Sequence, residues 1–209
     1  DLTGDWSSDV CSSDLKRLGL KLVSIDIASN CIARVFKNVH HIDNKISEFG
    51  IITIGKYSSS FIIIDKGKPF IERKVSFDIE KVIMEISQKK AMDEGSSQNY
   101  LEHVYDFNDI TKDSELHSKI SVHFENVFLN YERAIQFYSS GKVKKKLDKI
   151  FILTDGVNFN GFDKYVEKYF STDTQIINSS HSLMINTKFP KGNDFKQYIN
   201  CLGTLLRKE

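Results

Sequence analysis

The chain has 209 residues, of which 40% are hydrophobic and 27% charged, and its formal net charge is +1. This composition is typical of a folded globular chain, and so balanced a charge gives no overall field favouring nucleic acid. The 3 cysteines lack the close spacing of a zinc site or disulfide framework, which favours a reducing, cytoplasmic setting. The longest apolar run is strand-sized, far short of the roughly 20 residues that cross a bilayer.

The first residues differ in character from the rest. The segment DWSSDVCSSDL (5–15) repeats Ser-Ser-Asp, has no apolar periodicity and resembles the conceptual translation of a sequencing-library adapter. We therefore expect residues 1–15 to be a disordered, non-native tag, with the native reading frame beginning near Lys16. The alternative is a native disordered arm.

The first half of the chain predicts a strand, a short helix and then a meander of three strands. Apolar and polar residues alternate over 21–27, which is the period of a strand, and 28–36 reads as a helix. The runs 49–55, 58–65 and 70–77 are rich in β-branched and aromatic residues and are separated by short turns.

The second half alternates helices with strands. Apolar side chains recur at helical spacing after a capping residue, Asp78, and again along 116–139. The polar stretch 91–114 between them is expected to be a loop or an insertion. Two further strands and two further helices are expected over the following ranges: 150–154, 162–170, 174–178 and 195–206. This order predicts an α/β fold, a mixed sheet flanked by helices.

Single histidines and cysteines give no site. His117 and His123 are six residues apart, not the four of a helical zinc pair, and are interpreted as helix-surface residues. Cys31 and Cys201 lie beside apolar helix faces and are interpreted as core thiols. The lysines of 142–149 are interpreted as a solvated loop, the alternative being contact with an acidic partner or the membrane surface.

Three segments resemble, in the same order, the PilM family of type IV pilus assembly proteins and its FtsA-type relatives. They are GLKLVSIDIASNCIARVF (19–36), TIGKYSSSFIIIDKGKPFIERKVSF (53–77) and ERAIQFYSSGKVKKKLDKIFILTDGVNFNGFDKYVEKYF (132–170). The resemblance implies the actin-like, ribonuclease H-like fold. Residues 16–48 would be a connecting strand and helix from a first domain, and 49–209 the second domain.

The resemblance also implies where a nucleotide would bind. Gly55 with Ser58 and Ser59 matches the hairpin that approaches the phosphates, and Thr154 with Gly156 matches the turn beside adenine and ribose. Glycine allows backbone N–H groups to approach an anion without obstruction by a Cβ atom. The alternative is an ordinary serine-rich turn. ATP with magnesium is thus a possible ligand of the full-length protein.

This chain departs from the family pattern at the positions that the resemblance assigns to nucleotide and magnesium binding. Thr53 and Ala28 stand where acidic residues are expected, and Asp155 and Val157 replace glycines. A hydroxyl is a poor substitute for a carboxylate near magnesium. We therefore expect a degenerate site without catalytic residues or metal ligands, a pseudo-ATPase.

By resemblance, the function is a cytoplasmic scaffold of pilus assembly at the inner membrane. The implied partner is a PilN-like inner-membrane protein, whose groove would lie in the first domain, so no partner-binding residues are assigned. The alternative function is a nucleotide-dependent actin-like ATPase, such as an FtsA-like filament protein.

Overall fold

The structure is a computed structural model, and it describes residues 13–22, 25–38, 46–109, 111, 113–141, 145–183 and 195–207. Most of the expected tag, residues 1–12, lies outside the described residues, and 13–17 are helical. No helix in these ranges is long and apolar enough to span a membrane.

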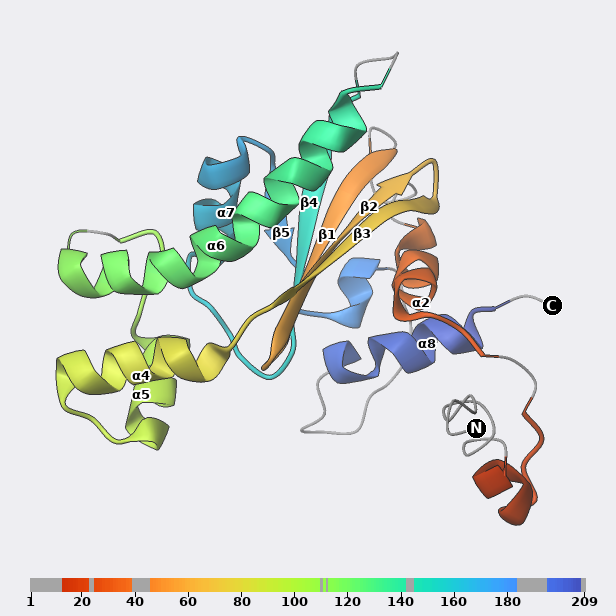
Figure 1. Ribbon diagram of the computed structural model, residues 1–209, viewed down its shortest axis with the longest axis horizontal. Helices are drawn as coiled ribbons and strands as arrows, with labels where there is room; N and C mark the ends of the chain where they lie inside the picture. The colour runs from red at the N-terminus through yellow and green to blue at the C-terminus, as the bar shows by residue number, and fades with distance from the viewer. Residues whose placement is uncertain are drawn as a thin grey trace, which may run out of the picture.

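The centre of the fold is a mixed five-stranded sheet in the order β3-β2-β1-β4-β5 (Figure 1). Strands β1, β2 and β3 form an antiparallel meander, and β4 and β5 extend the sheet in parallel from β1. The strands are β1 Glu48–Ile54, β2 Ser58–Asp65, β3 Lys68–Ser76, β4 Lys149–Thr154 and β5 Thr174–Ile176. The predicted meander and mixed sheet are therefore confirmed.

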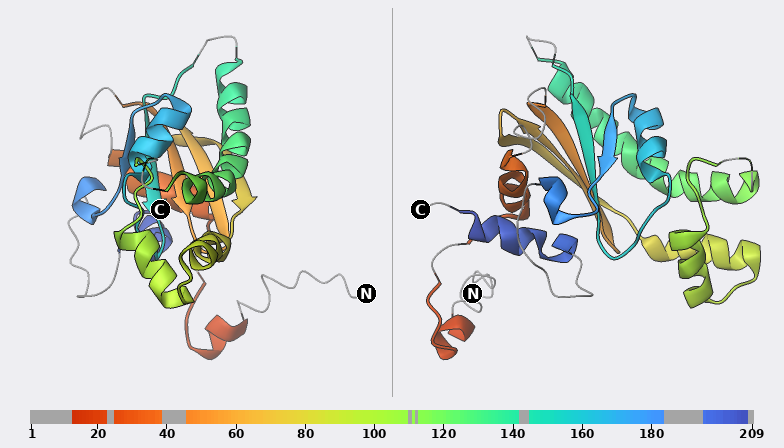
Figure 2. Two further views of the ribbon diagram at one scale, coloured as in Figure 1. Left: turned by 90° about the vertical axis from the view of Figure 1, so that its left-hand side faces the viewer. Right: turned by 180° about the vertical axis from the view of Figure 1, so that it is seen from behind.

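Helices cover both faces of the sheet. Helix α6 crosses in front of the sheet in Figure 1 and behind it in the reverse view of Figure 2, whereas α2 and α8 lie side by side at the lower right of Figure 1 and the lower left of the reverse view. The helices on the α6 side of the sheet are α4 Ile79–Lys90, α5 Glu94–His103, α6 Ser114–Ser139 and α7 Phe162–Phe170. The helices on the opposite side are α2 Ala28–Val35, η1 Phe36–Asn38, η2 Ser180–Leu183, η3 Phe195–Tyr198 and α8 Ile199–Leu205.

Strand alternation divides the interior into two cores, because successive side chains point to opposite faces of a sheet. Ile52 of β1 and Ile63 of β2 belong to the core under α4 to α7, whereas Ile51 and Ile62 belong to the core under α2 and α8. The expected aromatic stripe of α6 forms much of the first core, where Phe124 packs 5.0 Å from Phe162 of α7 between ring centroids.

Two element predictions are wrong. Residues 94–103 form helix α5, not a loop; Asp93 caps it by accepting a hydrogen bond from the Ser96 N–H at 2.9 Å. Only Ser97 and Leu101 are buried on this helix, so its apolar stripe is too weak to recognise in the sequence. The second wrong prediction is the strand over 21–27. Its described residues pair with no strand of the sheet, and Ile25 and Ile27 are exposed, so the alternating pattern does not correspond to a buried face.

Two side-chain interpretations are also wrong. His117 is on the buried face of α6, and its Nδ1 lies 2.8 Å from the hydroxyl of Tyr105, a polar contact that compensates for the burial. Cys31 is a core thiol, but Cys201 is exposed because it lies on the outer side of the short helix α8. In the basic segment, 142–144 lie outside the described residues, and Lys145 forms an ion pair with Asp65.

Candidate functional site

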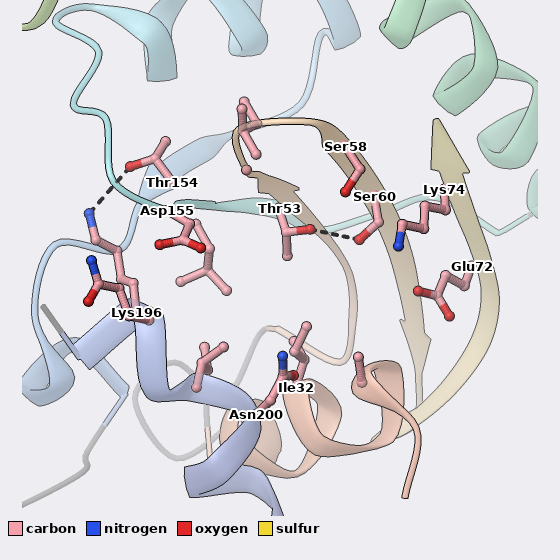
Figure 3. Close-up of a pocket in the computed structure, with 16 residues that line it drawn as sticks. Ile32, Thr53, Ser58, Ser60, Glu72, Lys74, Thr154, Asp155, Lys196 and Asn200 are labelled. Atoms are coloured by element: carbon pink, nitrogen blue, oxygen red, sulfur yellow. Dashed lines mark hydrogen bonds between the residues drawn. The ribbon is translucent and has the colours of Figure 1, made fainter. Parts of the chain in front are cut away.

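A cavity of about 250 Å³ lies where β1 and β4 end, between the sheet and helices α2 and α8 (Figure 3). The carboxyl ends of neighbouring parallel strands are the usual place for ligands in α/β sheets. The apolar wall of the cavity comes from both sides of this gap: Ala28, Ile32, Ile54, Leu153 and Ile199.

The β1–β2 hairpin forms one polar side of the cavity. The Gly55 N–H donates to the Ser58 carbonyl at 3.0 Å and closes the turn, and both residues line the cavity. Lys56, at the tip of the turn, is paired with Glu80 of α4 at 2.7 Å and is not part of the cavity wall. The hydrogen bond to Glu80 raises the pKa of Lys56.

Ser58 and Ser60 face the cavity, but Ser59 faces the opposite side of the sheet. Its hydroxyl accepts a hydrogen bond from the Tyr131 hydroxyl at 2.6 Å and donates to the Thr53 carbonyl at 2.8 Å. Ser59 is buried, so in this structure its side chain is a structural contact between β2 and α6.

Thr53 and Ser60 meet across the hairpin inside the cavity. They are directly paired in the β1–β2 register, and their hydroxyl oxygens lie 2.7 Å apart (Figure 3). Position 53, where the resemblance led us to expect an acid, therefore carries a neutral hydroxyl that already has a protein partner.

The end of β4 forms the other polar side. The Lys196 ammonium group, from η3, donates to the Thr154 hydroxyl at 3.3 Å, and both residues are buried. The Asp155 N–H donates to the Ile54 carbonyl at 2.8 Å, which holds the exposed Asp155 at the cavity edge.

Two residues of the predicted turn do not line the cavity. Gly156 has a φ of +79°, which explains why glycine occupies this position, but no heavy atom lies within 4 Å of a Cβ built there. Val157 packs against the core on the other face of the sheet. The structure thus brings Gly55, Ser58 and Thr154 together and leaves Ser59 and Gly156 outside.

The charges of the cavity are mixed. Lys74 and Lys196 supply positive charge, while Glu72 and Asp155 supply negative charge. Lysines, hydroxyls and a glycine turn can bind an anionic or hydroxyl-rich ligand. Magnesium is usually held by carboxylates together with substrate phosphates, and Thr53 offers only a hydroxyl that is already paired. The volume is also below the roughly 300–1,000 Å³ of sites that enclose a drug-sized ligand. The lysines and hydroxyls of this cavity fit a small polar anion.

The sequence analysis missed several cavity residues. Glu72 and Lys74 were visible only as alternate residues of a strand, and Lys196 and Asn200 only as polar positions of the last helix. No local motif marks any of them, because they approach the hairpin only after the chain has folded. In the described part of the chain, no three His, Cys, Asp or Glu side chains come together as metal ligands.

Comparison with solved structures gives the fold class. The chain aligns with MreB5 of Spiroplasma citri bound to ADP at a TM-score of 0.61 and 14% identity, over 94% of this chain and 63% of that one. It aligns with the ethanolamine utilization protein EutJ of Carboxydothermus hydrogenoformans at a TM-score of 0.56 and 14% identity, over 94% and 59%. The fold is therefore that of the actin-like proteins.

The family follows from the sequence model, and a third solved structure shares the fold. The model of the type IV pilus assembly protein PilM matches residues 10–207, so the chain belongs to this family. A PilM–PilN type IV pilus biogenesis complex aligns at a TM-score of 0.62 and 13% identity, over 90% of this chain and 54% of that one. The chain thus spans about half to two thirds of the length of these structures. Comparison with curated protein sequences finds no match.

Proposed function

We propose that the protein is a non-catalytic scaffold of type IV pilus assembly with a degenerate nucleotide site, and that ATP hydrolysis is not its activity. The observation that carries the proposal is the hydrogen bond between the Thr53 and Ser60 hydroxyls. It occupies the strand end where an actin-like ATPase needs a carboxylate to bind magnesium or orient water.

The domain organisation is part of the same proposal. We propose that residues 16–48 connect to a first domain and that residues 49–209 form the second domain of the actin-like fold. The partner is a PilN-like inner-membrane protein, as in the complex that this chain resembles. The protein accordingly acts at the cytoplasmic face of the inner membrane.

Calorimetric titration of Mg-ATP into the protein expressed from its complete gene tests the degenerate site. The variants are Thr53→Asp with Asp155→Gly, which restores the expected acid and glycine, and Thr53→Asn with Asp155→Gly as the matched uncharged control. We expect binding only by the Asp variant, because only its carboxylate can join a magnesium complex.

Tight binding and turnover by the unaltered protein would instead support the alternative, a nucleotide-dependent ATPase. The buried Lys196 beside Thr154 is the observation that favours this second candidate, since an ammonium group there can meet a phosphate. Failure of all three proteins to bind would show that the cavity is not a decayed nucleotide site.

A further inference from the structure

Strand β3 forms one edge of the sheet, next to β2, and no strand of the described chain lies on its outer side (Figure 1). Its residues are exposed, except for Ile71 and Val75, which are half-buried. An edge strand presents unpaired N–H and C=O groups, to which another strand can add. What can add there depends on which backbone groups point outward and on the charges beside them.

The hydrogen bonds between β2 and β3 show which backbone groups point outward. The Phe77 N–H donates to the Tyr57 carbonyl at 3.2 Å, and these two residues continue the β2–β3 register. Hydrogen-bonded and non-hydrogen-bonded pairs alternate along an antiparallel ladder. Arg73 therefore directs its N–H and C=O toward β2, whereas its neighbours Glu72 and Lys74 direct theirs toward the open edge.

The side chains of β3 are complementary to a second copy of the same strand. With two antiparallel strands and Arg73 at a twofold axis, Glu72 of each copy lies opposite Lys74 of the other, and each of these pairs exchanges both of its N–H···O bonds. Glu72 and Lys74 both line the cavity and so share one face; both are exposed, and neither has an ion pair among the described residues. On the other face, Ile71 of each copy meets Val75 of the other.

The same charges disfavour the other registers. A slip that moves the axis to Glu72 or to Lys74 places that residue opposite its own copy, and like charges directly opposed are destabilising. Pro69 has no N–H, and the register shifts between Ile63 and Ile64, so regular pairing stops at that end of β3. Edge lysines usually prevent pairing with other chains, but here an acidic residue two positions away matches the lysine of a second copy.

We infer that β3 is an interface between two copies of this chain, which pair antiparallel about a twofold axis at Arg73 and join their sheets into one. Such an interface uses the same patch on both subunits, as in most homodimers. Arg73 meets its own copy at the axis, and this like-charge contact keeps the dimer weak and reversible. The inference does not depend on the proposed function, because the sheet edge would pair whether or not the cavity holds a nucleotide.

Sedimentation velocity at rising protein concentration tests the interface. The unaltered chain should show a monomer–dimer equilibrium. Glu72→Lys leaves only lysines at the paired positions and Lys74→Glu only glutamates, so each variant alone should have a dissociation constant raised roughly tenfold or more. An equimolar mixture of the two variants should dimerise again, because lysines then oppose glutamates in both pairs.

Two further variants check the register and the specificity. Arg73→Gln should lower the dissociation constant, because it removes the like-charge contact at the axis. Lys168→Glu is the matched control, since it makes the same charge change as Lys74→Glu at an exposed position of α7, and it should leave dimerisation unchanged. The substituted residues of β3 are exposed, so the variants are expected to fold, which circular dichroism checks.

A chain that stays monomeric up to about 1 mM would overturn the inference. A mixture of the two charge variants that stays monomeric would do the same, as would a dimer that survives either single charge change, because the copies would then meet elsewhere. If Arg73→Gln leaves the dissociation constant unchanged or raises it, position 73 is not at the axis and the proposed register is wrong.

Discussion

Gly203 of α8 lies directly against the backbone of Cys31 in α2, and a Cβ atom at position 203 would be 2.1 Å from the Cys31 carbonyl oxygen. The two helices also share polar contacts: the Arg34 guanidinium group donates to the Gly203 carbonyl at 3.2 Å and pairs with Asp26. Because α2 and α8 form one wall of the cavity, this close approach sets the position of that wall.

Gly203→Ala should therefore lower the free energy of unfolding by about 1–3 kcal/mol, because the methyl group forces two backbones apart. Helix propensity alone predicts the opposite, a gain of about 1 kcal/mol. Urea denaturation measures the difference. Cys201→Ala, at an exposed position of the same helix, is the control and should change stability by no more than about 0.5 kcal/mol. Equal effects of the two changes would contradict the close contact.

The two faces of β2 predict different effects for neighbouring serines. Ser59→Ala should lower stability by about 1–3 kcal/mol, because it leaves the buried Tyr131 hydroxyl without its acceptor and removes the bond to the Thr53 carbonyl. Ser60→Ala removes one bond at a half-buried site and should cost less. Thermal denaturation compares them.

A double-mutant cycle sharpens this comparison. Tyr131→Phe should cost much less in the Ser59→Ala background than in the unaltered protein, because the bond is already absent. Additive losses would show that the two hydroxyls do not interact.

His117 should make stability depend on pH. Burial lowers its pKa in the folded state, with Lys168 lowering it further and Glu125 opposing the shift. The unfolded chain then binds the proton more readily, so this contribution is complete above the unfolded value of about 6.5 and is lost as pH falls below it. Denaturation curves between pH 7.5 and 5 should show a smaller loss for His117→Gln than for the unaltered protein. His123→Gln, at a half-buried position of the same helix, is the matched comparison. If stability falls with pH equally in both variants, His117 is not the source of the pH dependence.

Much of the fold could be predicted from local patterns. Strand β2 covers the predicted 58–65, and α4 begins after Asp78, whose carboxylate accepts from the Glu80 N–H at 3.1 Å as a capping residue should. These features depend on alternation, helical spacing and capping, which are properties of adjacent residues. Helix α5 was missed because it buries only two side chains and is held by packing against α4.

The candidate site was predicted only in part, for a geometric reason. Gly55, Ser58 and Thr154 lie at strand ends that meet at one edge of the sheet, so motif position located them. The choice between Ser59 and Ser60 depends on which face of β2 carries the cavity, and both faces of this strand are covered by helices.

The sequence by itself determined the alternation of strands and helices, the glycine turn at Gly55 and the hydroxyl at Thr53, since each is a local property of the chain. Only the tertiary structure decided that Lys196 reaches Thr154, 42 residues away, and that Ser121 and Tyr165 meet between α6 and α7. Such contacts form because two apolar faces of one sheet must each be buried by helices, and the identity of the side chains brought together follows from that packing.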